Sequence, residues 1–141
     1  GVLWTAARGE GAWRDGERLQ PRTGPSLDGA LVATGFQYVA EHRAQQGRLV
    51  AQLLPQVRDI RRLGAASVDL CHVAAGLIDG YYEQGLHPWD FAAAALVATE
   101  SGATVAGLDG GPADGELLIA AMPQTWTPLR DALREAGVHP F

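Results

Sequence analysis

The chain has 141 residues, of which 47% are apolar, and it carries a formal charge of −5 with a pI near 5.2. This size fits one domain with a substantial core, and the acidity argues against a nucleic-acid-binding surface, which would show clustered Lys and Arg. The single cysteine, Cys71, cannot form an internal disulfide, and no signal peptide or apolar span of about 20 residues is present. We therefore expect a reducing, cytoplasmic setting, with neither a membrane nor a nucleic acid as partner.

The N-terminal part of the sequence predicts a β-hairpin and then a loop. Two β-prone runs, 2–7 and 12–19, are joined by the turn Arg8-Gly9-Glu10-Gly11, and a second turn is expected at Asp15-Gly16 because glycine accepts a positive φ. The first run follows Gly1 directly, with no initiator Met and no turn or cap before it. We expect its sheet neighbours to lie upstream, in a longer protein.

Short strands and helices alternate from residue 30 onward. The apolar run Ala30–Gly35 is typical of a buried strand. From Glu41 to about Leu54 the leucines recur at helical spacing among Arg and Gln, and Pro55 ends the pattern. Residues 57–63 predict a short strand, and its three arginines indicate a solvated or subunit-facing edge. These arginines are Arg58, Arg61 and Arg62.

A second helix is predicted at Ser67–Ala75, opened by Gly64-Ala65-Ala66 and closed by Gly76. Cys71 is expected in the core of the protein. Neither Cys71 nor His72 has a second Cys or His at metal-ligand spacing, which argues against a zinc site.

The next stretch, Asp79–Gly102, starts as an aromatic strand and continues as a helix of small apolar residues that Trp89-Asp90 opens. Two further strands are expected at Ala103–Leu108 and Leu117–Ala121.

A last helix is predicted to begin at Thr127, which can cap it, with Pro128 at the first helical position. The alternation of strands and helices along the whole chain predicts an α/β layered sandwich, in which helices pack on a mixed sheet.

Three features of the sequence are candidates for a functional site. Asp90 is either a simple N-cap or an oxygen ligand for a hard cation such as Mg²⁺, and both uses are compatible because a carboxylate has two oxygens. We expect Trp89 to pack beside it. Glu83 is either an exposed strand residue or, if it points toward the end of the sheet where Asp90 lies, an acceptor for hydroxyl groups of a polyol. Gly64-Ala65-Ala66 either gives a helix room to approach the sheet or leaves a bare helix N-terminus that binds an anion or a hydroxyl group.

Residues 58–105, RDIRRLGAASVDLCHVAAGLIDGYYEQGLHPWDFAAAALVATESGATV, resemble the carboxy-terminal half of the inositol monophosphatase family. The most specific part is Trp89-Asp90 followed by small residues and a glycine, with Gly64 and Glu83 in order before it. The resemblance extends to GVLWTAARGEGAWRDGERL at the start and to the last helix, so it covers nearly the whole chain. The Arg-rich, Lys-free composition resembles an actinobacterial member.

This resemblance implies a Mg²⁺-dependent phosphomonoesterase with a layered α-β-α-β-α fold, usually a homodimer, that hydrolyses inositol monophosphate or a related sugar phosphate through metal-activated water. It implies that Asp90 binds a metal and contacts a small phosphorylated polyol, that Glu83 binds a sugar hydroxyl, and that Gly64, Ala65 and Ala66 lie along the substrate. The family commonly has Ser or Thr where this chain has Ala65, so one hydroxyl contact is lost.

A larger difference from the family is an absence. The family's upstream Glu-Glu pair and its Asp-Pro-(Ile/Leu)-Asp-Gly-Thr segment do not occur in this chain. Residues 1–141 are therefore expected to be the carboxy-terminal portion of a single domain whose upstream half is missing, and to be inactive alone. Three alternatives stay open. The substrate could be another one of the superfamily, such as fructose 1,6-bisphosphate, histidinol phosphate or a nucleotide 3′-phosphate. The chain could have a non-catalytic protein-binding role, or a separate chain could carry the missing half and complement it.

Overall fold

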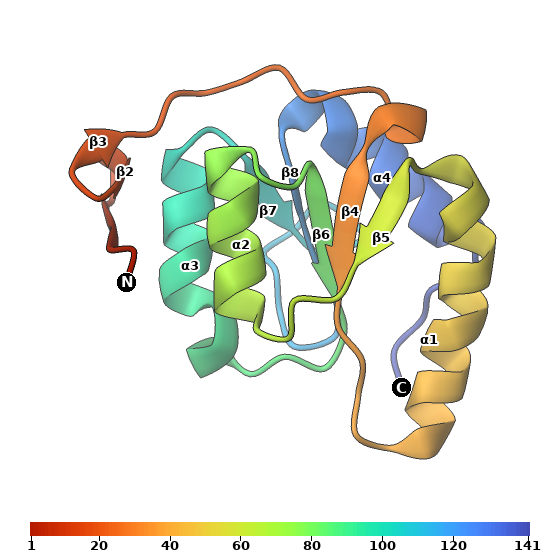
Figure 1. Cartoon of the computed structure of the whole chain (residues 1–141). Helices are drawn as coiled ribbons and strands as arrows, with labels where there is room; N and C mark the ends of the chain where they lie inside the picture. Colours follow the sequence, from red (N-terminus) through yellow and green to blue (C-terminus); the bar gives the residue numbers. More distant parts are fainter.

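The computed structural model describes residues 1–141, which form two sheets and four α-helices (Figure 1). The N-terminal sheet is antiparallel, in the order β1-β2-β3. Its strands are β1 (Trp4–Ala7), β2 (Gly11–Arg14) and β3 (Glu17–Arg18). The predicted hairpin and both of its turns are thus confirmed, and β1 is an edge strand that pairs with β2 alone.

The main sheet has five strands in the order β5-β4-β6-β8-β7. It is mixed, because β4 runs parallel to β5 and β6 whereas β8 runs antiparallel to β6 and β7. The strands are β4 (Leu31–Thr34), β5 (Asp59–Arg61), β6 (Gly80–Glu83), β7 (Thr104–Ala106) and β8 (Leu118–Ala121). Every strand expected from the sequence is present, and β5 is an edge strand with exposed arginines.

Two helices cover each face of this sheet (Figure 1). On one face lie α2 (Ala66–Ala75) and α3 (Pro88–Glu100), and on the other lie α1 (Ala40–Leu53) and α4 (Pro123–Glu135). Short 3-10 turns occupy Leu27–Gly29 and Leu54–Gln56. The predicted α/β layered sandwich is confirmed. No helix combines the length and the apolar character needed to cross a membrane.

The core is divided into two apolar clusters by the sheet, because successive strand residues point to opposite faces. Tyr81 belongs to the cluster under α2 and α3, together with Cys71, which is buried as expected. Tyr82 belongs to the cluster under α1 and α4. This alternation decides which side chains of β6 reach the candidate site described below.

The hairpin is attached to the main body through α3. The carboxylate of Glu100 accepts hydrogen bonds from the backbone amides of Gly9 and Gly11, at 2.8 and 2.9 Å. A single acid in the last turn of α3 therefore holds the β1–β2 turn.

The last helix begins five residues earlier than the sequence predicts: its first residue is Pro123 and not Pro128, and its N-cap is Met122 and not Thr127. Its first turn is held by distant residues: the Thr125 hydroxyl donates to the carbonyl of Pro25 at 2.7 Å, and the Trp126 indole donates to Ile119 O at 3.0 Å. Pro128 lies inside the helix, at an exposed position. There the carbonyl that loses its helical partner can be hydrated by water.

Candidate functional site

The topology brings the three predicted features to one end of the main sheet. Because β4, β5 and β6 are parallel, their carboxyl ends lie at the same edge, and α2 and α3 begin there after β5 and β6 (lower edge in Figure 1). Glu83 is the last residue of β6, Asp90 lies in the first turn of α3, and Gly64–Ala66 leads into α2. The negative charge of Asp90 also acts on the carboxyl of Glu83.

Asp90 does not cap α3 in the way expected. The N-cap is His87, and Asp90 is the third helical residue, whose Oδ2 accepts a hydrogen bond from the His87 amide at 2.8 Å. In a capping box the side chain of the third helical residue accepts a hydrogen bond from the N-cap amide, and Asp90 does so here. This is possible because the helix starts at Pro88, two residues before Asp90. The simple N-cap interpretation was wrong in position, but one carboxylate oxygen does serve the helix end.

Trp89 also differs from its expected placement beside Asp90. Its ring stacks on that of His87, with centroids 4.6 Å apart, and 80% of the residue is exposed. Adjacent residues within a helix do not face each other, so Trp89 points away from Asp90.

Glu83 is half-buried, unlike an ordinary strand glutamate. Its Oε2 accepts a hydrogen bond from the Tyr81 hydroxyl at 2.5 Å. Burial raises the pKa of the Glu83 carboxyl above its ordinary range, the Tyr81 hydrogen bond and the charge of Arg62 lower it, and the charge of Asp90 raises it further. The end of β6 thus carries a partly buried carboxyl group, one oxygen of which is hydrogen-bonded to Tyr81.

The N-terminus of α2 is bare of capping side chains. Ala65 is its N-cap and makes no side-chain hydrogen bond, and Gly64 before it has a φ of +102°, which favours glycine. Gly64 and Ala65 are exposed, whereas Ala66 is buried. The first amides of α2 therefore have no side chain that satisfies them, which is the condition for binding an anion or a hydroxyl group.

Asp69 is a residue of this region that the sequence reasoning missed. It lies in α2, only 1% exposed, and its Oδ1 is buried without a hydrogen-bond partner. Burial, and next the charge of Glu83, raise the pKa of Asp69 to about 7, while the charge of Arg62 opposes this. The one hint in the sequence was that Asp69 lies between apolar residues of a helix expected to be buried. The sequence alone does not distinguish such an acid from one at the surface.

These side chains do not by themselves form a metal site. No group of three or more His, Cys, Asp or Glu side chains in the chain is arranged to hold a metal ion. Mg²⁺ keeps near-octahedral oxygen coordination, whereas Asp90 already uses Oδ2 for the helix end. The residues of this chain alone therefore do not fit Mg²⁺.

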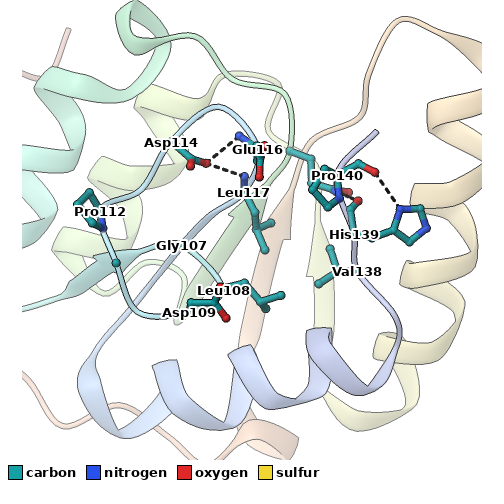
Figure 2. A pocket seen from close by; sticks show the side chains of 12 residues that line it. Gly107, Leu108, Asp109, Pro112, Asp114, Glu116, Leu117, Val138, His139 and Pro140 are labelled. Atoms are coloured by element: carbon teal, nitrogen blue, oxygen red, sulfur yellow. Dashed lines mark hydrogen bonds between the residues drawn. The ribbon is translucent and has the colours of Figure 1, made fainter.

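A separate cavity of about 390 Å³ lies on the α1 and α4 side of the sheet. Figure 2 shows that the loop 107–117 and the C-terminal segment 138–140 line it, and Gln84 contributes from the end of β6. In that loop Asp114 Oδ1 accepts hydrogen bonds from the backbone amides of Glu116 and Leu117, at 2.9 and 3.4 Å. None of the predicted site residues lines this cavity.

The comparisons with known proteins agree with this architecture. The sequence model of the inositol monophosphatase family matches residues 1–136. This chain belongs to the inositol monophosphatase family. Among the solved structures of the family, Mycobacterium tuberculosis SuhB covers 97% of the chain with a TM-score of 0.86 at 40% identity, and the chain covers 56% of that structure.

Curated relatives of the family carry two kinds of name. An inositol-1-monophosphatase of Mycobacterium leprae is 49% identical over 110 residues, which are 77% of this chain and 38% of the relative. The Nus factor SuhB of Escherichia coli K12 is 46% identical over 110 residues, 77% of this chain and 41% of that protein. The chain thus spans about two fifths of the curated relatives it matches.

Proposed function

We propose that this chain is the carboxy-terminal portion of one inositol monophosphatase-like domain, in a cytoplasmic, homodimeric Mg²⁺-dependent phosphomonoesterase. The substrate is inositol monophosphate or a related sugar phosphate. The observation that carries the proposal is the convergence of Glu83, Asp90 and the bare N-terminus of α2 at one end of the sheet, in a chain of this family.

Each element of the site has a separate task in this proposal. The free oxygen of Glu83 accepts a hydrogen bond from a hydroxyl group of the polyol, because its other oxygen is taken by Tyr81. The backbone of Gly64, Ala65 and Ala66 lies along the substrate and offers the unsatisfied amides of α2. Asp90 contacts the polyol and binds a metal ion together with carboxylates that the longer protein supplies.

The same proposal makes the isolated chain inactive, since three clustered ligands are not available within it. The test is phosphate release from myo-inositol 1-phosphate with Mg²⁺, measured for the chain and for the longer protein that contains it. We expect turnover only by the longer protein, and we expect Asp90→Asn to abolish it. Robust turnover by the isolated chain would contradict the proposal.

The substrate within the superfamily is open to a direct comparison. Fructose 1,6-bisphosphate, histidinol phosphate and a nucleotide 3′-phosphate should be assayed beside myo-inositol 1-phosphate, because part of the pocket wall would lie upstream. A higher kcat/KM for one of these three would replace the proposed substrate without changing the reaction class.

A second candidate function is protein binding, which the Nus factor name of the Escherichia coli relative favours. The candidate surface is the exposed edge formed by Arg58, Arg61 and Arg62, of which Arg61 pairs with Asp59 at 2.5 Å. If Asp90→Asn removes phosphatase activity but leaves a cellular phenotype of the gene intact, the binding function is supported. Loss of both together would argue for catalysis alone.

A further inference from the structure

Tyr81 is a fully buried residue whose hydroxyl lies at the candidate site. The residue is 0% exposed and packs in the core under α2 and α3. Because strand residues two apart share a face, its hydroxyl reaches Glu83 and donates to Oε2 at 2.5 Å. Burial, and next the charge of Glu83, raise the pKa of Tyr81 far above its ordinary range. Tyr81 therefore keeps its proton and acts as a donor at any physiological pH.

Gly35 confines the same carboxylate from another strand. A Cβ atom built at Gly35 would lie 2.2 Å from Cδ, Oε1 and Oε2 of Glu83, so the chain after β4 passes directly beside the carboxylate. Tyr81 is the one protein group that donates a hydrogen bond to this carboxylate. One oxygen is thus anchored from the core, and the other is left for a ligand.

The charged groups around Glu83 explain why the hydrogen bond from Tyr81 matters for its ionisation. The charge of Asp90 in α3 raises the pKa of Glu83, the charge of Glu83 raises the pKa of Asp69 in α2, and the charge of Arg62 before α2 lowers both. The Tyr81 hydroxyl is the hydrogen-bond donor that offsets these acids, because a donor stabilises the ionised form of a carboxyl. An ionised Glu83 accepts hydrogen bonds from hydroxyl groups, whereas a protonated one would present its own hydrogen.

We propose that Tyr81 is a positioning residue for substrate recognition, which orients the Glu83 carboxylate so that its free oxygen accepts a hydrogen bond from a hydroxyl group of a polyol phosphate. The inference rests on the proposed function, because it requires Glu83 to meet the polyol. It assigns to a core tyrosine a task in choosing polyol phosphates over phosphate esters without hydroxyl groups. If the Tyr81 hydroxyl only filled space in the core, its removal would change the stability of the fold but not the preference for polyol phosphates.

The test compares Tyr81→Phe with Tyr82→Phe in the longer protein that contains this chain. Tyr82 is the matched control, because it is the neighbouring buried tyrosine, it faces the opposite core, and its hydroxyl has no hydrogen-bond partner. We expect Tyr81→Phe to raise KM for myo-inositol 1-phosphate about tenfold, the effect of losing one charge-assisted hydrogen bond. KM for 4-nitrophenyl phosphate, which has no polyol hydroxyl groups, should stay within about twofold, and Tyr82→Phe should change neither value.

A second measurement does not depend on turnover. The ¹³C shift of the Glu83 carboxyl, followed against pH in the 141-residue chain, should show a higher pKa in Tyr81→Phe and no change in Tyr82→Phe. An unchanged Glu83 pKa in Tyr81→Phe, or equal effects on both substrates, would refute the positioning role. If the unmodified longer protein hydrolyses neither ester, the proposed function fails and the inference with it, whereas the carboxyl titration still reports whether Tyr81 controls Glu83.

Discussion

The substitution Asp69→Asn should make the stability of this chain less dependent on pH. Asp69 is 1% exposed and its Oδ1 has no partner, and burial together with the charge of Glu83 raises its pKa from the ordinary value of 3.8 to about 7. Because the pKa in the folded chain is higher than in the unfolded chain, ionisation of Asp69 disfavours the folded state. Its contribution to stability is therefore complete below about pH 4 and is lost as pH rises through 7.

The size of the effect follows from the pKa values. One unit of pKa is worth about 1.4 kcal/mol, so the change from 3.8 to about 7, in which the opposing charge of Arg62 is already included, corresponds to roughly 4 kcal/mol at pH 8. Asparagine keeps the shape of the side chain and does not ionise. Asp69→Asn should therefore have about the stability of the original chain at pH 4.5 and exceed it by roughly 2 to 4 kcal/mol at pH 8.5.

The assay is urea unfolding of the 141-residue chain at pH values from about 4.5 to 8.5, with the free energy of unfolding compared at each pH. Asp59→Asn is the control, because Asp59 is held in its ionised form by Arg61, which lowers its pKa, so its contribution to stability is lost as pH falls. This control should show no gain in stability at high pH. A difference between Asp69→Asn and the original chain that is the same at pH 5 and pH 8 would refute the assignment of Asp69 as a buried titrating acid.

Three further substitutions or reagents test single contacts of the fold. Gly35→Ala should cost about 1 to 3 kcal/mol of stability in urea unfolding, because its Cβ would lie 2.2 Å from the carboxyl atoms of Glu83; an unchanged midpoint would show that the carboxylate moves freely. Glu100→Gln should destabilise the chain by about 1.5 to 3 kcal/mol, because one of the two amides of the β1–β2 turn loses its acceptor. Hydrogen exchange of the Gly9 and Gly11 amides should accelerate. Exchange at the original rate would contradict the role of Glu100 in holding this turn. Cys71 should resist a thiol reagent at pH 8 until the chain unfolds, because burial raises its pKa to about 11, and rapid labelling of the folded chain would contradict its core position.

Elements whose signals are local can be predicted from the sequence. Glycine marks the hairpin turns and the end of α2, where Gly76 adopts a left-handed conformation with a φ of 73°. Apolar periodicity defines β4 and α1 to within one or two residues. The stretch 58–105, with Trp89-Asp90 as its most specific part, resembled the inositol monophosphatase family, and the family match over residues 1–136 confirms that prediction. These features depend on backbone preferences and spacing, which neighbouring residues encode.

Contacts between distant segments become visible only in the folded structure. The start of α4 depends on bonds from its first turn to Pro25 and Ile119, which no local capping rule includes. Asp69 looks like any helical acid until the packing of α2 on the sheet buries it. The close passage of Gly35, just after β4, beside the Glu83 carboxylate likewise exists only once β4 and β6 have paired. Burial and hydrogen bonding across layers are properties of the assembled fold, and they decide which acids of this chain are available for chemistry.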